Sequence, residues 1–290
     1  MGCVMVRPEA VLLESSSSPA TAAGSTDLAF EIALLTDVGT NRENNEDACD
    51  HFIESADTVV FAVADGVGGY DGGEVASAMA VEVTLRAYRE SASNLEPGKR
   101  LYRAVQRANI EIHDRALAVP ELRRMATTLT AVVVSNGLLQ VAHVGDCRLY
   151  LVRRGRMVQL TKDHTVVQER VRMGLMTAAR ARNHPERSAL TRSIGHELVV
   201  SVDRITLGLE QDDRLMVCSD GLHGVLEDAE LERAIRGMDA QTACGSLIKT
   251  ANERGTADNL TVAIFTQKAP TATRAPRGVM RRLADFFRSA

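Results

Sequence analysis

Residues 59–66 read VVFAVADG, an unbroken apolar run that ends in an Asp-Gly pair. The same design returns at residues 215–221, LMVCSDG, and residues 143–146, HVGD, form a third junction between apolar and acidic residues. Short apolar runs bounded by turn residues are typical of buried strands. The chain therefore places carboxylates at the ends of several buried strands.

Two further acidic groups accompany these junctions. Residues 42–47 read RENNED, and Asp258-Asn259 stands directly before the apolar run at residues 260–266. Mg²⁺ and Mn²⁺ prefer oxygen ligands and retained waters over the nitrogen of His and the sulfur of Cys. Carboxylates gathered from several strand ends therefore predict a site for a hard divalent cation.

Composition narrows the classes of function. The 290 residues fit one large domain or two small ones, and 45% of them are apolar. The chain has no Trp and only 3% aromatic residues, which argues against base stacking on nucleic acid. The net charge of −4 combines +5 in residues 268–290 with −9 in the remainder. An acidic body agrees with a multi-carboxylate site, and no nucleic-acid partner is expected.

Cysteine usage and the start of the chain indicate the compartment. The five cysteines are odd in number and lack CxxC spacing, which is typical of reduced, buried thiols in an intracellular protein. No apolar run reaches the length of a transmembrane helix. Val6 stands where a myristoylation signal needs Ser or Thr, and no charged segment precedes an apolar one as in a signal peptide. The sequence predicts a cytoplasmic protein.

The polarity of the chain divides it into a leader, one folded domain and a tail. Residues 1–26 are rich in Ser, Ala, Thr and Pro, and we expect a disordered leader there. The folded domain is expected over residues 27–267, followed by a basic amphipathic tail at residues 268–290. Within the domain, residues 161–200 form a polar, Arg-rich insert with only short helical pieces, such as residues 166–173. An insert of this length inside a compact domain is usually functional.

Apolar periodicity assigns the remaining elements. Strands are expected where short apolar runs alternate with turns, at residues 30–36, 59–64, 128–135, 138–144, 147–152, 157–160, 205–207, 215–218 and 260–266. Helices are expected at residues 74–89, 97–117, 227–236 and 241–254. Because the long helices do not alternate regularly with strands, a doubly wound parallel fold is disfavoured. The expected class is α+β, with two antiparallel sheets packed together and helix pairs outside.

Eight short segments make the chain resemble a known family. They are residues 36–47 (TDVGTNRENNED), 64–69 (ADGVGG), 125–129 (MATTL), 144–150 (VGDCRLY), 160–164 (LTKDH), 190–195 (LTRSIG), 218–222 (CSDGL) and 258–261 (DNLT). In order and spacing they resemble the motifs of the PP2C-type (PPM) metal-dependent protein serine/threonine phosphatases, in the style of the bacterial branch. The resemblance spans about residues 30–267. It implies a four-layer α-β-β-α sandwich, with residues 161–200 as a flap beside the active site.

The resemblance also implies protein ligands for two or three Mn²⁺ or Mg²⁺ ions. These ligands are Glu46, Asp65, the backbone carbonyl of Gly66, Asp146, Asp220 and Asp258. Asp65 would bridge two ions. Glu46 and Gly66 would complete the ligands of one, and Asp220 and Asp258 would hold the other. Asp146 would pair with Asp220 at a weaker third ion.

Two residues are implied for catalysis and substrate binding. Asp47 would orient metal-bound water, and a water shared between two ions can attack phosphorus in line. Arg42 lies four residues before Glu46. Its planar fork would bind two phosphate oxygens and stabilise the growing negative charge. This chemistry requires no cysteine nucleophile.

Departures from the family pattern leave the proton donor to the leaving group open. Val67 stands where eukaryotic relatives have a His proposed as general acid, and Tyr70 stands where bacterial relatives often have His. A metal-bound water is the alternative donor. His164 is expected to support its loop, and Asp163 is left open between capping that loop and binding metal.

The function implied is hydrolysis of phosphoserine and phosphothreonine on proteins by a monomeric enzyme that opposes a bacterial Ser/Thr kinase. Phosphorylated proteins are the expected partners, among them a Ser/Thr kinase and its substrates. A catalytically silent scaffold that binds phosphoproteins is the alternative from another class, and the intact acidic set with Arg42 argues against it. A two-metal phosphodiesterase or nuclease would share the chemistry, but it would need a basic groove with stacking aromatics.

Basic residues gather in two places outside the motifs. The insert carries six arginines, which could receive phosphorylated segments by charge steering, although a solvated loop has the same composition. In the tail, Val279, Leu283, Phe286 and Phe287 fall on roughly one helical face. A weak contact with an anionic membrane or a partner is one interpretation of that face, and disorder or packing on the body is the other.

Overall fold

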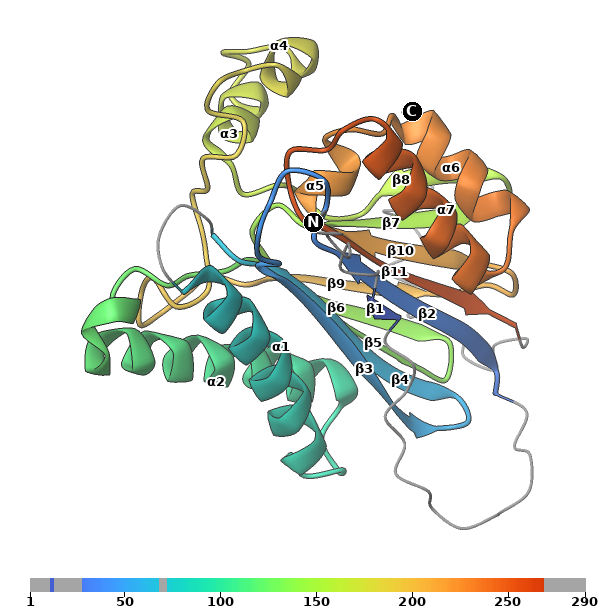
Figure 1. Ribbon diagram of the computed structural model, residues 1–290. Helices are drawn as coiled ribbons and strands as arrows, with labels where there is room; N and C mark the ends of the chain where they lie inside the picture. The colour runs from blue at the N-terminus through green and yellow to red at the C-terminus, as the bar shows by residue number, and fades with distance from the viewer. Residues whose placement is uncertain (1–10, 13–27, 68–71, 269–290) are drawn as a thin grey trace, which may run out of the picture.

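The computed structural model describes residues 11–12, 28–67 and 72–268, which form two packed antiparallel sheets. In order across the first sheet, the six strands are β1 (Val11–Leu12), β2 (Phe30–Asp37), β11 (Leu260–Gln267), β10 (Arg214–Cys218), β7 (Arg148–Arg153) and β8 (Arg156–Gln159). The second sheet has five strands, β3 (Asp47–Ser55), β4 (Thr58–Asp65), β5 (Leu129–Ser135), β6 (Leu138–Val144) and β9 (Asp203–Gly208). Figure 1 shows the two sheets face to face.

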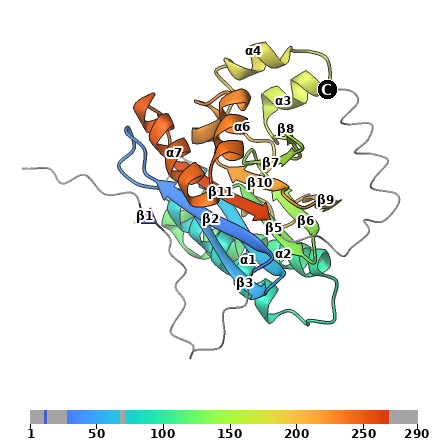
Figure 2. The same cartoon turned by 90° about the vertical axis from the view of Figure 1, so that its right-hand side faces the viewer.

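Helix pairs cover the outer face of each sheet. The five-stranded sheet is covered by α1 (Gly73–Glu90) and α2 (Pro97–Ala118), and the six-stranded sheet by α6 (Asp228–Gly237) and α7 (Ala240–Glu253) (Figures 1 and 2). Four shorter helices complete the described chain, namely the 3-10 helix η1 (Pro120–Leu122), α5 (Asp220–His223) and the pair α3 (Val166–Arg172) and α4 (Ala178–Arg182) within the insert. The predicted four-layer α-β-β-α sandwich is confirmed.

The stretch at residues 59–66 is apolar throughout because β4 is buried on both faces. Side chains alternate across a strand, so Val59, Phe61 and Val63 enter the core between the two sheets. Val60 and Ala62 enter a separate core beneath α1 and α2. A half-exposed strand would alternate apolar with polar residues, whereas a strand inside a four-layer sandwich has no exposed face.

Residues 214–218 repeat this arrangement in the other sheet. Leu215 and Val217 of β10 pack between the sheets, while Met216 and Cys218 pack beneath α6 and α7. The two interior strands thus end in Asp-Gly turns after passing through the middle of the molecule. Both turns emerge at the edge of the sandwich from which the insert projects (Figure 1).

Most predicted elements occur within one or two residues of their expected bounds, but the strand β3 was missed. Its sequence, DACDHFIES, is more than half polar without a regular alternation, and the strand lies at the border of its sheet, where only β4 pairs with it. An edge strand with few buried residues lacks the apolar run by which the other strands were predicted. The helix α5 was also not predicted, because four residues are too few to show a helical period.

The leader and the tail lie almost entirely outside the described residues. Within the leader, Val11 and Leu12 pair with Thr36 and Leu35 of β2, a contact that the prediction of a disordered leader did not include. The amphipathic tail begins where the described chain ends, so the domain boundaries and the tail stay predictions. No helix in the described ranges is long and apolar enough to cross a membrane.

Candidate active site

The sheet ladders bring the acidic junctions together at one edge of the sandwich. β3 begins at Asp47 and β4 ends at Asp65, and these two residues are paired in the antiparallel ladder. β10 ends just before Asp220, and its partner β11 begins just after Asp258. Asp146 follows β6 in the same region, where its charge acts on Asp65. Carboxylates that are up to about two hundred residues apart in the chain therefore face one site.

Burial and mutual repulsion make this cluster electrostatically costly. Burial raises the pKa of Asp65 well above its ordinary value, and the negative charges of Asp47 and Asp220 raise it further. Burial also raises the pKa of Asp146 well above its usual range, with Asp220 as the next cause. The pKa of Asp220 is raised to about 6, again by burial first and by Asp258 second. A bound cation would relieve this crowding of negative charge.

Two glycines allow the backbone to pack closely around the carboxylates. The Gly66 N–H donates to the Glu46 carbonyl at 2.9 Å, and a Cβ at Gly66 would lie 2.5 Å from the Gly73 carbonyl oxygen. At Gly221, a Cβ would collide with the carbonyl oxygen of Asn259. Both Asp-Gly pairs thus need glycine because another segment of backbone lies directly against them.

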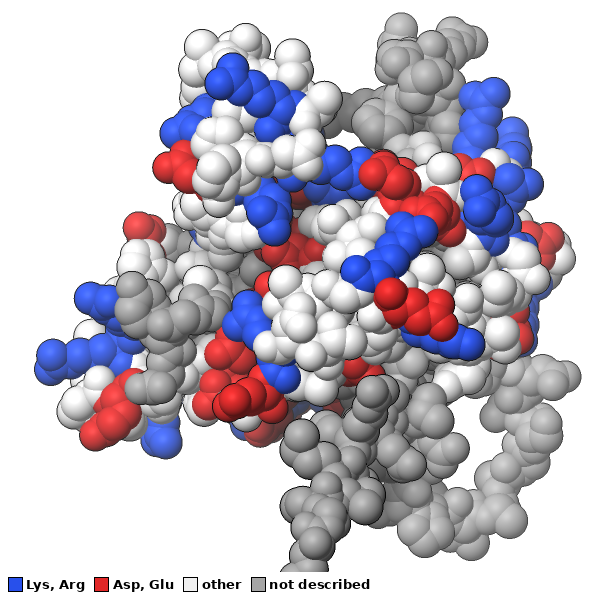
Figure 3. Space-filling view, turned by 45° about the horizontal axis from the view of Figure 1, so that its top comes forward, with Lys and Arg blue, Asp and Glu red and all other residues white. Residues whose placement is uncertain are grey.

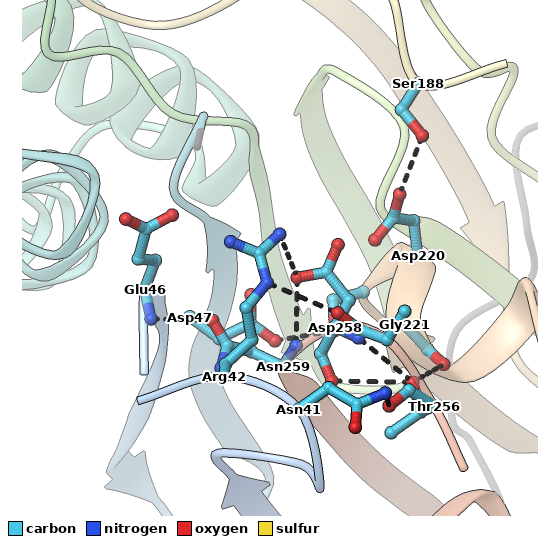
Figure 4. A network of polar contacts seen from close by, with 12 residues as sticks. Asn41, Arg42, Glu46, Asp47, Ser188, Asp220, Gly221, Thr256, Asp258 and Asn259 are labelled. Carbon is cyan, nitrogen blue, oxygen red and sulfur yellow. Dashed lines mark hydrogen bonds and ion pairs between the residues drawn. The ribbon is translucent and has the colours of Figure 1, made fainter. Parts of the chain in front are cut away.

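Asn259 fastens the acidic loop at residues 38–46 to the start of β11. Its side-chain oxygen accepts the Glu46 N–H at 2.9 Å, and its amide donates to the carbonyls of Val38 and Asn44 at 2.9 Å each (Figure 4). Asn259 is buried, with 3% of its surface exposed. The sequence motif contains this residue, but only the structure shows that it positions Glu46.

Glu46 lies against the first residue of α1. A Cβ added to Gly73 would lie 3.0 Å from the Glu46 carboxyl carbon and 3.2 Å from each carboxylate oxygen. Burial raises the pKa of Glu46, while the nearby Arg42 charge acts in the opposite direction. The space that holds this carboxylate therefore exists because residue 73 has no side chain.

Asp47 is buried and firmly held. The Ser219 hydroxyl donates to its Oδ2 at 2.7 Å, and the same hydroxyl accepts the Thr261 N–H at 3.0 Å. Burial raises the pKa of Asp47 to about 7, although the hydrogen bond from Ser219 lowers it. Ser219 stands beside the Asp220-Gly221 pair, and sequence reasoning gave it no role. The signal that could have identified Ser219 is its position in the motif, directly before Asp220.

Arg42 lies at the rim of the site. Its Nη2 pairs with Asp258 Oδ1 at 2.9 Å, and its Nε donates to the Ala257 carbonyl at 3.3 Å (Figure 4). The side chain is 38% exposed, so the guanidinium is open to solvent on the side away from Asp258. A cation at this position can reach an anionic ligand that approaches the carboxylates from outside.

The Asp65-Gly66 turn is tied to a pair of threonines. The Thr128 hydroxyl accepts the Asp65 N–H at 2.9 Å, and the Thr127 hydroxyl donates to the Asp65 carbonyl at 2.8 Å. Thr127 also bridges to Gly66 on one side and to Ile194, where the insert returns, on the other. These contacts explain the Thr-Thr motif as the support of the acidic turn.

The insert stands over the carboxylates and encloses a cavity of about 380 Å³. The body contributes Asp146, Asp220 and Asp258 to the lining, and the insert contributes Arg182, Arg187 and Ser188 among others. Figure 3 shows a recessed acidic patch between basic side chains on this face. We name residues 161–200 the flap, as the resemblance implied. Figures 1 and 2 both show α3 and α4 projecting beyond the sheets.

The basic charge of the flap is partly neutralised. Arg170 pairs with Glu186 at 2.9 Å, Arg182 with Glu227 at 2.7 Å, and Arg192 with Asp203 at 2.9 Å. Within the described residues, no ion pair involves Arg187, which lines the cavity near Asp220. Charge steering by the flap therefore rests on fewer free guanidinium groups than its six arginines indicated.

The structure places Asp163, whose role the sequence left open, but it does not identify the proton donor. Asp163 Oδ2 pairs with Arg148 Nη2 at 2.7 Å, and Gln159 donates to its Oδ1 at 2.9 Å. Asp163 therefore belongs to a buried ion pair, and the charge of Arg148 helps to hold its pKa below the usual range despite burial. Val67 has no proton to donate from its side chain, and Tyr70 lies outside the described residues.

One serine joins the site without any sequence signal that we used. The Ser188 hydroxyl, on the flap, approaches Asp220 Oδ2 at 3.5 Å (Figure 4). Within the described residues, no group of three or more His, Cys, Asp and Glu side chains already has the spacing of a formed metal centre.

Comparison with known proteins agrees with this fold. The family described as Protein phosphatase 2C matches residues 39–261. The serine/threonine phosphatase stp of Listeria innocua is 36% identical over 231 residues, covering 78% of this chain and 92% of the relative. Protein phosphatase PhpP of Streptococcus pneumoniae is 35% identical over 248 residues, covering 84% of this chain and 100% of the relative.

A solved structure extends the likeness to three dimensions. The crystal structure of the catalytic domain of PstP in complex with two manganese ions superposes with a TM-score of 0.74 and 30% identity. The match covers 83% of this chain and 99% of that chain. The four-layer sandwich with acidic strand ends is the architecture of a phosphoprotein phosphatase. This chain belongs to the protein phosphatase 2C family.

Proposed function

We propose that this protein removes phosphate from phosphoserine and phosphothreonine of phosphorylated proteins, depends on Mn²⁺ or Mg²⁺, and opposes a Ser/Thr kinase. The observation that carries the proposal is the meeting of acidic residues from separate strand ends beside Arg42 and the flap cavity. The names of the relatives support the reaction, since stp is described as a serine/threonine phosphatase. The manganese ions in the PstP structure support the metal dependence.

The residues fit a centre of two or three hard cations. The proposed ligands are Glu46, Asp65, the Gly66 carbonyl, Asp146, Asp220 and Asp258. All of them offer oxygen, which Mg²⁺ and Mn²⁺ prefer. Burial first and neighbouring carboxylates second raise the pKa values of Asp65, Asp146 and Asp220, which supports a site where bound cations offset the negative charge. Divalent cations bound there supply Lewis acidity and an activated water for attack on phosphorus.

Arg42 and Asp47 take separate roles around that centre. Arg42 can exchange its contact with Asp258 for two phosphate oxygens, because both partners are more than a third exposed and such pairs are weak. Its guanidinium then stabilises the negative charge that grows on the phosphoryl group. Asp47 cannot swing in this way, since Ser219 fixes one of its oxygens and the residue is buried. A fixed carboxylate can orient a water molecule by accepting a hydrogen bond from its O–H group.

The test is release of phosphate from a phosphothreonine peptide with and without Mn²⁺. Wild type is compared with Asp220→Ala, and Asp50→Ala serves as the matched control because Asp50 is an exposed aspartate of β3. Turnover that requires Mn²⁺, disappears in Asp220→Ala and persists in Asp50→Ala would establish the phosphatase. A folded wild-type protein that binds the peptide but does not hydrolyse it, with or without Mn²⁺, would overturn the proposal and favour a binding scaffold.

A further inference from the structure

Two buried histidines hold the turn that carries Asp146. His164 and His223 come from two separate segments, the base of the flap and α5. They expose only 4% and 8% of their surfaces, respectively. Neither histidine takes part in the reaction described above, and each directs one ring nitrogen at the backbone of Gly145 or Asp146.

His164 binds Gly145 at two points. Its Nδ1 accepts the Gly145 N–H at 3.0 Å, and its own backbone N–H donates to the Gly145 carbonyl at 2.8 Å. Gly145 has φ of +108°, and a Cβ there would collide with Thr128. The turn therefore requires glycine at this position. The two bonds from His164 hold the turn in that conformation.

The proton of His164 is placed by its second nitrogen. Because a backbone N–H can only donate, Nδ1 must be the acceptor and the ring proton must lie on Nε2. Nε2 faces two groups at 3.3 Å, Asp203 Oδ2 and Arg192 Nη1, and Arg192 donates to the other oxygen of Asp203 at 2.9 Å. A guanidinium cannot accept a proton, so Asp203 is the acceptor for the Nε2 proton. The carboxylate of β9 therefore selects the tautomer that the Gly145 bond requires.

His223 contacts the next residue of the same turn. Its Nε2 lies 3.1 Å from the Asp146 carbonyl oxygen, and since a carbonyl can only accept, Nε2 donates. His223 is the last residue of α5, the short helix that begins at Asp220. One imidazole thus links the backbone of Asp146 to the helix that carries Asp220.

We propose that His164 and His223 are positioning residues that hold Asp146 beside Asp220, so that the two carboxylates can share one divalent cation. The inference rests on the proposed function for the identity of that cation. Residues that orient a ligand without touching the metal typically contribute a factor of about 10 to 100 in metal affinity. The fixed backbone of Asp146 supplies the orientation here, because no side chain among the described residues donates a hydrogen bond to its carboxylate.

The chemistry of the two histidines allows matched substitutions with opposite expectations. The side-chain oxygen of Asn reaches about as far as Nδ1, and the amide nitrogen of Gln reaches about as far as Nε2. His164→Asn keeps an acceptor for Gly145, whereas His164→Gln moves it away. At His223 the order reverses, because His223→Gln keeps the donor to Asp146 and His223→Asn is too short. A role in packing alone would not produce this reversal.

The experiment is calorimetric titration of the metal-free full chain with Mn²⁺, which gives the number and affinity of bound ions without any substrate. The ion that Asp146→Ala loses serves as the reference. We expect that ion to bind about 10 to 100 times more weakly in His164→Gln and His223→Asn, and near wild type in His164→Asn and His223→Gln. The remaining ions should bind as in wild type.

The outcomes separate the inference from the proposed function. Equal Mn²⁺ binding by all four variants, or equal loss by both variants at one position, would overturn the positioning role. If His164→Gln fails to fold, Asp203→Ala takes its place, since the Asp203 side chain is 40% exposed and reaches the turn only through the ring of His164, its other partner being Arg192. Unchanged binding in Asp203→Ala would then count against His164. A wild type that binds Mn²⁺ but releases no phosphate refutes the phosphatase alone.

Discussion

The substitution Gly73→Ala should separate function from stability. Gly73 is the first residue of α1 and has ordinary helical backbone, so alanine is compatible with its conformation. The added methyl group would lie 3.0 Å from the Glu46 carboxyl carbon and 3.2 Å from both oxygens, and these are its three nearest neighbours. Contacts this short require the Glu46 side chain to move by a few tenths of an ångström.

The size of the effect follows from what such a movement does to a metal ligand. Ligand distances in metal sites tolerate only about 0.2 Å of change. We therefore expect Mn²⁺ affinity and kcat/KM to fall by about 10- to 100-fold, equivalent to about 1.4 to 2.7 kcal/mol. Alanine is a better helix former than glycine by about 1 kcal/mol, which offsets the crowding in the free energy of unfolding. Thermal stability of the metal-free protein should stay close to wild type.

The assay pairs phosphate release and Mn²⁺ titration with thermal unfolding of the metal-free protein. Gly245→Ala in α7 is the matched control, because no atom lies within 4 Å of the added methyl group. It should raise the unfolding temperature by a few degrees and leave turnover unchanged. Wild-type turnover and metal affinity in Gly73→Ala would refute the reasoning that Glu46 binds metal from this position. A large loss of stability would show that the methyl group disrupts packing instead.

Three further predictions concern stability. Asp213→Ala removes the buried partner of Arg153, whose Nε lies 2.9 Å from Asp213 Oδ1. The free energy of unfolding, measured in urea, should fall by about 3 to 5 kcal/mol. A fall below about 1 kcal/mol would mean that water replaces the carboxylate. His143 is fully buried, and burial with the nearby His164 lowers its pKa to about 4. The unfolded chain binds this proton near pH 6.5 and the folded chain does not, so stability is lost as pH falls from about 6.5 to 4, by up to about 3 kcal/mol. His143→Gln should flatten that part of the pH profile, and an unchanged slope would assign it to other groups. Mn²⁺ at about 100 times its Kd should stabilise wild type by about 2.7 kcal/mol, and equal stabilisation of Asp220→Ala would place the ion elsewhere.

Much of the fold follows from local patterns of polarity. A strand that is apolar at every position, such as β4, has to be buried on both faces, and two such strands in separate parts of the chain require a layered molecule. The edge strand β3 was not predicted because it is held by pairing with β4, and its own residues form neither an apolar run nor an alternation. Pairing is a contact between distant segments, which a local pattern does not contain.

The site divides in a similar way. The sequence by itself determined the acidic set and its oxygen chemistry, because Asp-Gly turns after buried runs and the ordered motifs are visible in the chain. Only the tertiary structure decided which neutral groups hold those acids. Ser219 meets Asp47 across 172 residues, Asn259 meets Glu46 across 213, and His223 meets the Asp146 carbonyl across 77. Short-range polarity records whether a residue is buried, but a hydrogen-bond partner is chosen by the folded chain, where strand pairing and helix packing set the distance between distant atoms.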